Sequence, residues 1–290
     1  RLHLGFYGFD DRYGYKYGSM GLAINAHKTI ISVKHSQNVV SDLPKKYILP
    51  LIKYLRLKRA KSNFEIKILQ KSPSHIGLGS GTQLSLSIGM AISKLFNLNL
   101  EANDIANIYN RGKRSGTGIS IFRQGGFVVD ACKKDGLLPR DMFKSKFPKD
   151  WRIILLNDIK LKGASGKREN KFFSKSSRTN HKQSELSHIL FRGILPSIVY
   201  EDFQGFSKNL TEFQRNTAEF YREKQKGIFL SPEISKIMEY VKNYDNLGMG
   251  QSSWGPMSYI FVESKLHAKE LLSIIQNKFN VYNNVQLNIV

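Results

Sequence analysis

Cysteine is nearly absent from the sequence, since Cys132 is the only one among 290 residues. A single cysteine excludes an internal disulfide and any zinc site built from several thiolates. The sequence also lacks an apolar run near the roughly 18 to 20 residues that a membrane-spanning helix needs, and it shows no N-terminal signal pattern. These absences predict a protein of the reducing cytoplasm that has no membrane partner.

Acidic residues are scarce, with 23 Asp and Glu against 45 Lys and Arg, and the formal net charge is +22. A nucleic-acid-binding protein uses such charge to displace counterions from phosphates, whereas an enzyme for small polyanions uses a focused part of it to attract substrate. The lysines are spread along the whole chain, and the aromatic residues sit mostly within apolar patterns. We interpret most of the charge as a solvated surface around a local anion site, and we disfavour nucleic acid as a partner.

The chain is long for one compact unit and suits two domains of ordinary size, and a hydrophobic content of 41% provides a core. Composition changes near "FKSKFPKDWRIILLN", where Pro148 precedes Trp151 and an apolar, strand-like run. We therefore predict an N-terminal domain at residues 1–149 and a C-terminal domain at residues 150–290. The polar, lysine-rich segment 162–182 is predicted to be a mobile loop.

The spacing of apolar residues, alternating in strands and three to four residues apart in helices, predicts where the strands and helices lie. The chain ends on the strand, helix and strand patterns "MSYIFVE", "KLHAKELLSIIQNKF" and "VQLNIV", which fit an α+β sandwich. Ser231 followed by Pro232 marks a helix start. The other predicted elements are strands at 28–35, 64–71 and 125–130, a basic helix after Pro50, a helix after Gly81, a short helix at 102–112 and helices from about Glu185 to Tyr221.

A glycine-rich stretch, "SHIGLGSGTQLSLSIGMAI" (74–92), leads straight into the helical pattern after Gly81. Glycines let the backbone adopt positive φ and approach an anion closely, and a helix N-terminus offers unpaired N–H groups. The stretch is not a Walker A loop, because no Gly-Lys-Ser/Thr closes it. Taken alone, it is equally consistent with a plain turn and with a phosphate cradle.

Two further glycine-rich stretches precede strand patterns. "NRGKRSGTGISIFRQGGFVVD" (110–130) is basic, and alone it favours a long solvated loop. "GMGQSSWGPMSY" (248–259) combines glycines with a Gln, two serines and a Trp. A plain connector rarely has that composition, so we favour a functional loop over a glycine turn with a packed tryptophan.

Taken in order, "PSHIGLGSGTQL", "SGTGISIFRQGGFVVD" and "GMGQSSWGPMSY" resemble the GHMP superfamily of small-molecule kinases and their relatives. With "RLHLGF" and "YGSMGLAI" near the start, the chain more narrowly resembles the β-ribofuranosylaminobenzene 5′-phosphate synthase family. The resemblance implies a two-domain α+β fold, with an N-terminal α/β sandwich, a ferredoxin-like C-terminal domain and a site in the cleft between them. The same resemblance implies a homodimer.

One position departs from the kinases of this superfamily. The kinase segment that matches "SGTG" reads Ser-Gly-x-Asp, and its Asp serves as the base, whereas this sequence has Gly118 there. A phosphoryl acceptor would lose its expected carboxylate. The departure favours the synthase, and an ATP-dependent kinase remains the alternative enzyme. A basic nucleic-acid-binding module is the third hypothesis.

The synthase resemblance implies phosphoribosyl diphosphate as the donor, 4-aminobenzoate or 4-hydroxybenzoate as the acceptor, Mg²⁺ as the cofactor and methanopterin-type cofactor synthesis as the pathway. We expect His3 and Asp202 in catalytic roles, Asp202 also as the metal contact, and Trp254 stacked on the benzoate ring or packed in the core. The substrate-binding candidates are Gly77, Gly79, Ser80, Gly81, Thr82, Gln83, Arg114, Ser115, Gly116, Gly250, Gln251, Ser252, Ser253 and Trp254.

Overall fold

The computed structural model describes residues 1–9, 13–59, 63–163, 182–225, 227–244, 246–280 and 282–290. The mobile loop predicted at 162–182 therefore lies, apart from its ends, outside the described residues. None of the described helices is both long and apolar enough to cross a membrane.

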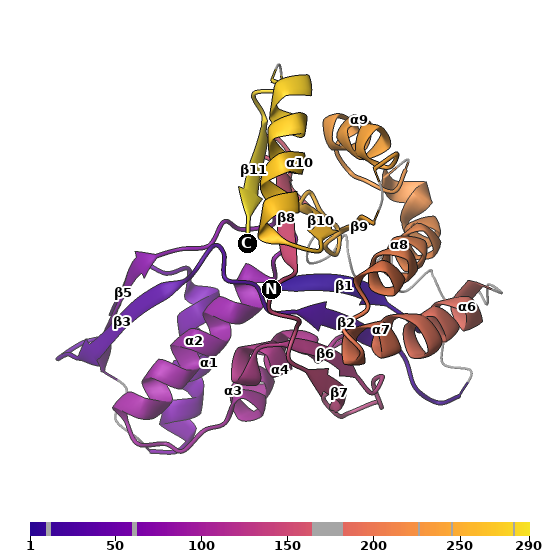
Figure 1. The fold of residues 1–290 in the computed structure, drawn as a ribbon. Coiled ribbons are helices and arrows are strands. Elements are labelled where there is room, and N and C mark those ends of the chain that lie inside the picture. Colours follow the sequence, from indigo (N-terminus) through magenta and orange to yellow (C-terminus); the bar gives the residue numbers. More distant parts are fainter. Residues whose placement is uncertain (10–12, 60–62, 164–181, 226, 245, 281) are drawn as a thin grey trace.

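In the described part of the N-terminal half, the structure has two sheets and four helices (Figure 1). The larger sheet has the strand order β1-β2-β6-β7 and is antiparallel throughout. The smaller sheet has the order β3-β5-β4, in which the short β4 runs parallel to β5. The elements of this half are β1 (Leu2–Phe6), β2 (Ser19–Leu22), β3 (Ile30–His35), β4 (Val40–Ser41), α1 (Lys45–Leu57), β5 (Phe64–Gln70), α2 (Ser80–Leu95), α3 (Ala102–Ile108), α4 (Thr117–Gln124), β6 (Phe127–Asp130) and β7 (Asp141–Ser145).

The described residues of the C-terminal half form an antiparallel sheet with the order β11-β8-β10-β9. Numbered along this half alone, the order is 4-1-3-2, and helices follow its first and third strands, so the predicted ferredoxin-like arrangement is confirmed. Its elements are β8 (Arg152–Asp158), α6 (Lys182–Ile189), the π-helical turn η1 (Leu190–Ile194), α7 (Leu195–Val199), α8 (Phe203–Gln225), α9 (Pro232–Val241), β9 (Gly248–Gln251), β10 (Ser258–Val262), α10 (Lys265–Lys278) and β11 (Val285–Ile289).

The largest apolar core joins the two halves. It includes Leu2 and Leu4 of β1 together with Phe206 and Phe213 of α8, all fully buried. The long helix α8 contacts β1 on one side of the boundary and β9 and β10 on the other. This shared core fixes the ends of β1 and β9 relative to each other, and the candidate site is built on those ends.

Three predicted elements differ in the structure. Helix α1 begins at Lys45, after Pro44, so Pro50 lies inside it and not before it. An interior proline removes one backbone hydrogen bond and crowds the carbonyl four residues before it, but burial of Leu51 and Leu55 stabilises the helix against this cost. The basic stretch 110–130 is not a long loop, because Thr117–Gln124 forms α4 and buries Ile119 and Ile121. Similarly, the first residues of the stretch 248–259 form the strand β9.

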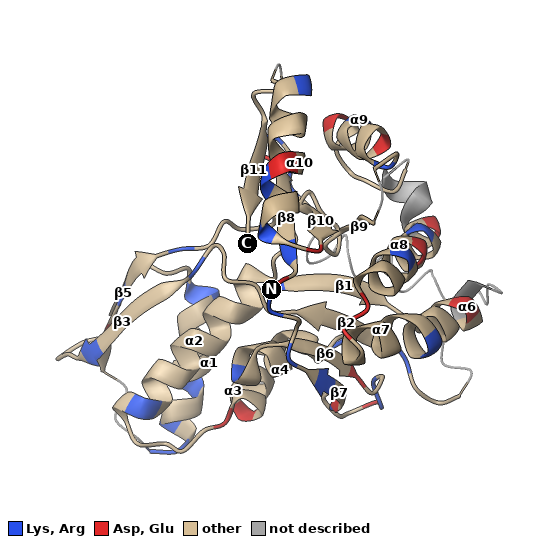
Figure 2. Ribbon diagram, viewed as in Figure 1, with Lys and Arg blue, Asp and Glu red and all other residues tan. Residues whose placement is uncertain are grey.

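Basic residues lie on helices and strands of both halves, including α1, α8 and α10 (Figure 2). Among the described residues they do not gather on a single helix or strand. This distribution fits the interpretation that most of the net charge of +22 is a solvated surface.

Candidate active site

The "GLGSG" loop ends in the first turn of helix α2. Gly79 is the N-cap and has φ +64, a left-handed conformation that favours glycine, and it supplies no side-chain acceptor. The amides of Thr82 and Gln83 donate to the Gly79 carbonyl at 3.1 and 3.2 Å. The amides of Ser80 and Gly81 have no intrahelical acceptor, because they precede the first full turn. The helix therefore presents N–H groups and its partial positive charge at this point.

An arginine side chain covers the same turn. A Cβ added at Gly79 would lie 2.7 Å from Cζ of Arg1, and one added at Gly118 would lie 2.7 Å from Arg1 Nε. Arg1 thus lies against both the N-cap of α2 and the first turn of α4. On the other side of the loop, Arg111 Nη2 donates to Ser85 Oγ at 3.3 Å. The guanidinium groups and the helix N-terminus are all positive and repel one another. A bound anion would relieve this repulsion, so the turn is suited to hold an anion.

The segment 114–118 is anchored on a buried carboxylate that sequence reasoning missed. Asp130, at the end of β6, is fully buried and accepts hydrogen bonds from Gly116 N at 2.7 Å, Ser19 N at 2.7 Å and Ser19 Oγ at 2.6 Å. Burial raises its pKa to about 6, although these hydrogen bonds act to lower it. An Asp directly after the apolar run "FVV" is the signal that would have indicated a buried carboxylate.

The predicted binding residues near α4 take part in this anchor. Ser115 Oγ lies 2.7 Å from Ser19 Oγ and 2.8 Å from Thr117 Oγ1, within hydrogen-bond distance of both. Gln83 Nε2 donates to the Gly118 carbonyl at 2.9 Å, which ties the first turn of α2 to α4. Arg114 is partly exposed and acts electrostatically on His3. The first turns of α2 and α4 are therefore held in a fixed position relative to each other.

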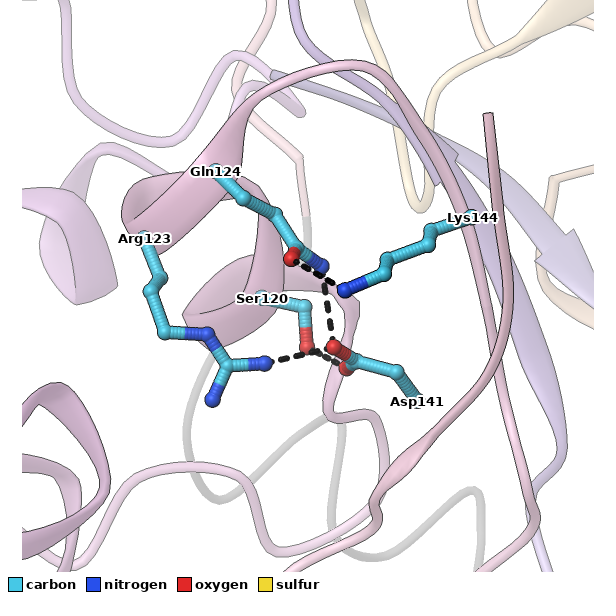
Figure 3. Close-up of polar contacts among 5 residues, drawn as sticks. All are labelled: Ser120, Arg123, Gln124, Asp141 and Lys144. Carbon is cyan, nitrogen blue, oxygen red and sulfur yellow. Dashed lines mark hydrogen bonds and ion pairs between the residues drawn. The ribbon is translucent and has the colours of Figure 1, made fainter. Parts of the chain in front are cut away.

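The far end of α4 is held by a second polar cluster (Figure 3). Asp141, at the start of β7, accepts hydrogen bonds from Ser120, from Arg123 Nη2 at 2.5 Å and from Gln124 Nε2 at 2.9 Å. Lys144 Nζ donates to Gln124 Oε1 at 3.2 Å. Asp130 at one end and Asp141 at the other fix the axis of α4 and therefore the direction of its N-terminus.

The "GQSSWG" stretch packs against the "GLGSG" loop and is hydrogen-bonded to it. Ser252 is fully buried, and its Oγ donates to the Gly77 carbonyl at 2.8 Å and accepts from His3 N at 3.0 Å. A Cβ at Gly77 would lie only 2.5 Å from the Ser252 carbonyl oxygen. The Ser253 amide donates to the His3 carbonyl at 3.2 Å. The structure thus brings the first and third glycine-rich stretches into direct contact.

The remaining candidates of this stretch support the fold. Trp254 is 8% exposed and belongs to the largest core, so the structure favours the packed tryptophan over a ring stacked on benzoate. Gln251 Oε1 accepts from the Leu230 amide at 2.7 Å, ahead of helix α9. A Cβ at Gly250 would lie 2.5 Å from Gln214 Cγ, so this glycine allows α8 to pack closely on β9.

His3 lies at the junction of these loops as a neutral imidazole. It is 5% exposed, and its Nδ1 accepts a hydrogen bond from Gly5 N at 3.3 Å. Burial, together with the nearby charges of Arg1 and Arg114, lowers its pKa to about 3. A neutral ring whose Nδ1 accepts carries its proton on Nε2. At neutral pH His3 is therefore a hydrogen-bond donor through Nε2 and only a weak base.

Asp202 does not join this cluster. Its Oδ1 accepts from Gly205 N at 2.9 Å, so it caps helix α8, and it is exposed. At 1.5 Å per residue, the helix places Asp202 about 18 Å from Gln214, the residue of α8 that accepts a hydrogen bond from the Gln251 amide beside Ser252. Its neighbour Glu201 has φ +55, so the pair occupies a turn between helices and not the helix that the sequence suggested.

The pKa of His3 predicts an acid-dependent loss of stability. The unfolded chain binds a proton near pH 6.5 and the folded chain only near pH 3. Stability is therefore present above pH 6.5 and falls as the pH drops toward 3, by up to about 1.4 kcal/mol per pH unit. The raised pKa of Asp130 acts in the opposite direction between pH 3.8 and about 6. We expect His3→Gln to lose the acid-dependent destabilisation, so that lowering the pH from 7 to 4.5 no longer lowers the urea midpoint and the remaining Asp130 contribution raises it.

His188→Gln, at an exposed position, is the matched control and should keep the pH dependence of the unmodified chain. The comparison is urea unfolding followed by circular dichroism at three pH values. An unchanged pH slope in His3→Gln would contradict the assignment of a buried, neutral His3.

Two family profiles match the chain. The GHMP kinase N-terminal domain matches residues 46–124, and the GHMP kinase C-terminal domain matches residues 194–281. The chain therefore belongs to the GHMP kinase superfamily, as the sequence resemblance implied.

Curated relatives narrow this assignment. The chain is 34% identical to the beta-ribofuranosylphenol 5′-phosphate synthase of Archaeoglobus fulgidus over 216 residues, which cover 69% of this chain and 65% of that protein. It is 28% identical to the synthase of the same name from Methanothermobacter thermautotrophicus, covering 91% of this chain and 87% of that protein. A homoserine kinase of Saccharolobus islandicus is 28% identical over only 97 residues, or 30% of this chain and 31% of that protein. The resemblance to a ribofuranosyl-arene phosphate synthase is confirmed.

Solved structures show the same fold. The homoserine kinase of Cytophaga hutchinsonii superposes with a TM-score of 0.70 at 14% identity, covering 95% of this chain and 88% of that chain. The phosphomevalonate kinase of Streptococcus pneumoniae superposes with a TM-score of 0.73 at 12% identity, covering 100% and 96%. At such low identity the likeness defines the fold and not the reaction.

Proposed function

We propose that this protein condenses phosphoribosyl diphosphate with 4-hydroxybenzoate or 4-aminobenzoate and releases carbon dioxide and diphosphate. The product is a ribofuranosyl-arene 5′-phosphate, the type of compound that the relatives' name describes, and the proposed pathway is methanopterin-type cofactor synthesis. One observation of the site carries the proposal. The first turn of α2 presents unpaired amides beside Arg1, whose guanidinium lies against both Gly79 and Gly118.

The reaction separates charge at the donor. The bond between ribose C1 and the diphosphate oxygen breaks, and its electron pair leaves with diphosphate. The ring carbon that bears the carboxylate forms the new bond to C1. The electrons of its bond to the carboxylate then return to the ring, and carbon dioxide departs without any net proton transfer. Such a reaction needs a fixed anion site and correct orientation more than a strong base.

The described residues match those demands. The amides of Ser80 and Gly81 can donate to the departing oxygens, and Arg1 balances their charge. His3, neutral at pH 7, adds a donor and no competing base. Ser252 holds the "GLGSG" loop through the Gly77 carbonyl, and Asp130 holds the neighbouring start of α4 through the Gly116 amide, which keeps the amide donors in place before the reaction begins.

We also propose that the reaction uses magnesium, although the described residues do not form a metal site of their own. Among the described residues there is no group of three or more His, Cys, Asp or Glu side chains that could hold a metal ion. Both carboxylate oxygens of Asp130 already accept hydrogen bonds from the chain. We therefore propose that magnesium reaches the site as the counterion of the donor's diphosphate, and we derive no step from it.

The residue at position 118 argues against the alternative that this protein is a kinase. Where the superfamily kinases carry their catalytic Asp, Gly118 leaves room that the Arg1 guanidinium fills. A cation at this place cannot accept the proton of an alcohol. Homodimer formation remains a proposal, and light scattering of the purified chain tests it.

The deciding experiment supplies phosphoribosyl diphosphate, magnesium and 4-hydroxybenzoate or 4-aminobenzoate labelled in the carboxyl group. We expect labelled carbon dioxide and diphosphate in equal amounts, without any requirement for ATP. Turnover of ATP with a small alcohol, together with no release of label from either benzoate, would overturn the proposal in favour of a kinase.

A further inference from the structure

A cavity of about 300 Å³ lies beside the anion site. It is bounded by the start of α2, through Ser80 and Gln83, and by the connection between β2 and β3, through Ala26 and Thr29. Arg1 also lines it. Because Arg1 contacts the anion loop at Gly79 as well, one guanidinium borders both the loop and the cavity.

The lining combines apolar walls with positive charge. Ile24, Leu78 and Phe122 supply apolar surface, Arg1 and Lys28 supply full positive charges, and none of the described Asp or Glu residues lines the cavity. Burial lowers the pKa of His27, which also lines it, so this histidine is neutral near pH 7. A ligand that fits must therefore have a flat or rounded apolar body and a negative group.

We propose that this cavity is the acceptor site and binds the aromatic carboxylic acid with its carboxylate toward Arg1. The inference rests on the proposed function and adds to it the place of the second substrate. The donor's phosphates carry several charges and match the amides of the α2 turn, whereas a benzoate carries one charge on an apolar ring. The walls formed by Leu78 and Phe122 suit the ring and not a polyphosphate.

The reaction requires this orientation. The ring carbon that bears the carboxylate attacks ribose C1, so the carboxylate end must lie next to the diphosphate loop. Arg1 occupies that junction. The substituent opposite the carboxylate then points into the cavity, where Thr29 and Ser72 contribute hydroxyl groups. Hydroxyl groups accept from and donate to both an amino and a hydroxy substituent, which is why the cavity accepts either acid.

The test fills the cavity without touching the anion loop. Ala26 lines the cavity, and Ala26→Phe adds a ring inside it. We expect the Kd of 4-hydroxybenzoate, measured by calorimetry with inorganic diphosphate present, to rise at least ten-fold, while the Kd of phosphoribosyl diphosphate stays within two-fold. Ala131→Phe makes the same change at an exposed position outside the cavity and should alter neither.

Each outcome decides the inference. Equal affinity of both variants for the acid, equal loss of donor affinity in Ala26→Phe, or no binding of the acid to the unmodified chain would overturn the acceptor site. ATP binding that Ala26→Phe abolishes while the acid still binds would assign the cavity to a nucleotide instead. Failure of the proposed reaction itself shows separately, as absence of labelled carbon dioxide from the unmodified protein.

Discussion

Gly79→Val should weaken binding of phosphoribosyl diphosphate at least 100-fold while the protein stays folded. Position 79 has φ +64, where a β-branched side chain is strained, and its Cβ would lie 2.7 Å from Arg1 Cζ. The turn must shift and Arg1 must move away, so the amides of Ser80 and Gly81 no longer point at the phosphates. Loss of two hydrogen bonds to a charged group costs about 3 kcal/mol or more, which corresponds to roughly 100-fold in Kd.

The measurement is calorimetric titration with the donor and with inorganic diphosphate. Gly136→Val is the matched control, because Gly136 also has positive φ, at +79, but a Cβ there meets nothing within 4 Å. This control suffers the same backbone strain without reaching the loop, so its donor affinity should not change. Unaltered affinity in a folded Gly79→Val variant would show that "GLGSG" is only a turn.

The sequence predicted the helix that follows the loop because local rules determine it. Glycines before a run with helical spacing predict a helix start, and α2 begins at Ser80 and buries Leu84, Ile88 and Ile92. Ser231 was recognised as an N-cap for the same reason, and its Oγ accepts from the Ile234 amide at 3.3 Å.

Contacts between distant residues escaped prediction. Asp202 was proposed as a metal contact, but its capping of α8 depends on where that helix begins. The role of Asp130 depends on Ser19 and Gly116, which are 111 and 14 residues away in the chain. Arg1 was not considered at all, since only the folded chain brings it against both Gly79 and Gly118.

The domain boundary near residue 150 was inferred from composition. In the structure, β7 ends at Ser145 and β8 begins at Arg152, in different sheets. Yet Trp151 packs on Phe203 and Phe206, with ring centroids 5.0 and 4.9 Å apart, inside a core that includes β1. Composition along the chain cannot show that two halves share one core, because that depends on which apolar faces meet.

Gly118→Asp should weaken donor binding at least ten-fold and should not create a kinase. A Cβ at this position would lie 2.7 Å from Arg1 Nε, so the new carboxylate would pair with the guanidinium that balances the diphosphate. At about 4 Å, two unit charges interact by roughly 4 kcal/mol at an effective dielectric constant of 20. The carboxylate therefore removes the positive charge of Arg1 from the anion and adds repulsion of its own. A base already paired with Arg1 is also a poor acceptor for the proton of an alcohol.

Gly118→Asn separates charge from size, because Asn has nearly the same volume as Asp and no charge. We expect the Asn variant to lose much less affinity for the donor than the Asp variant, and the gap between them to narrow as salt screens the charges. Donor affinity and carbon dioxide release are measured for both variants across magnesium and salt concentrations. Equal losses would mean that packing at α4 matters and charge does not, and unchanged binding in both would place residue 118 away from the phosphates.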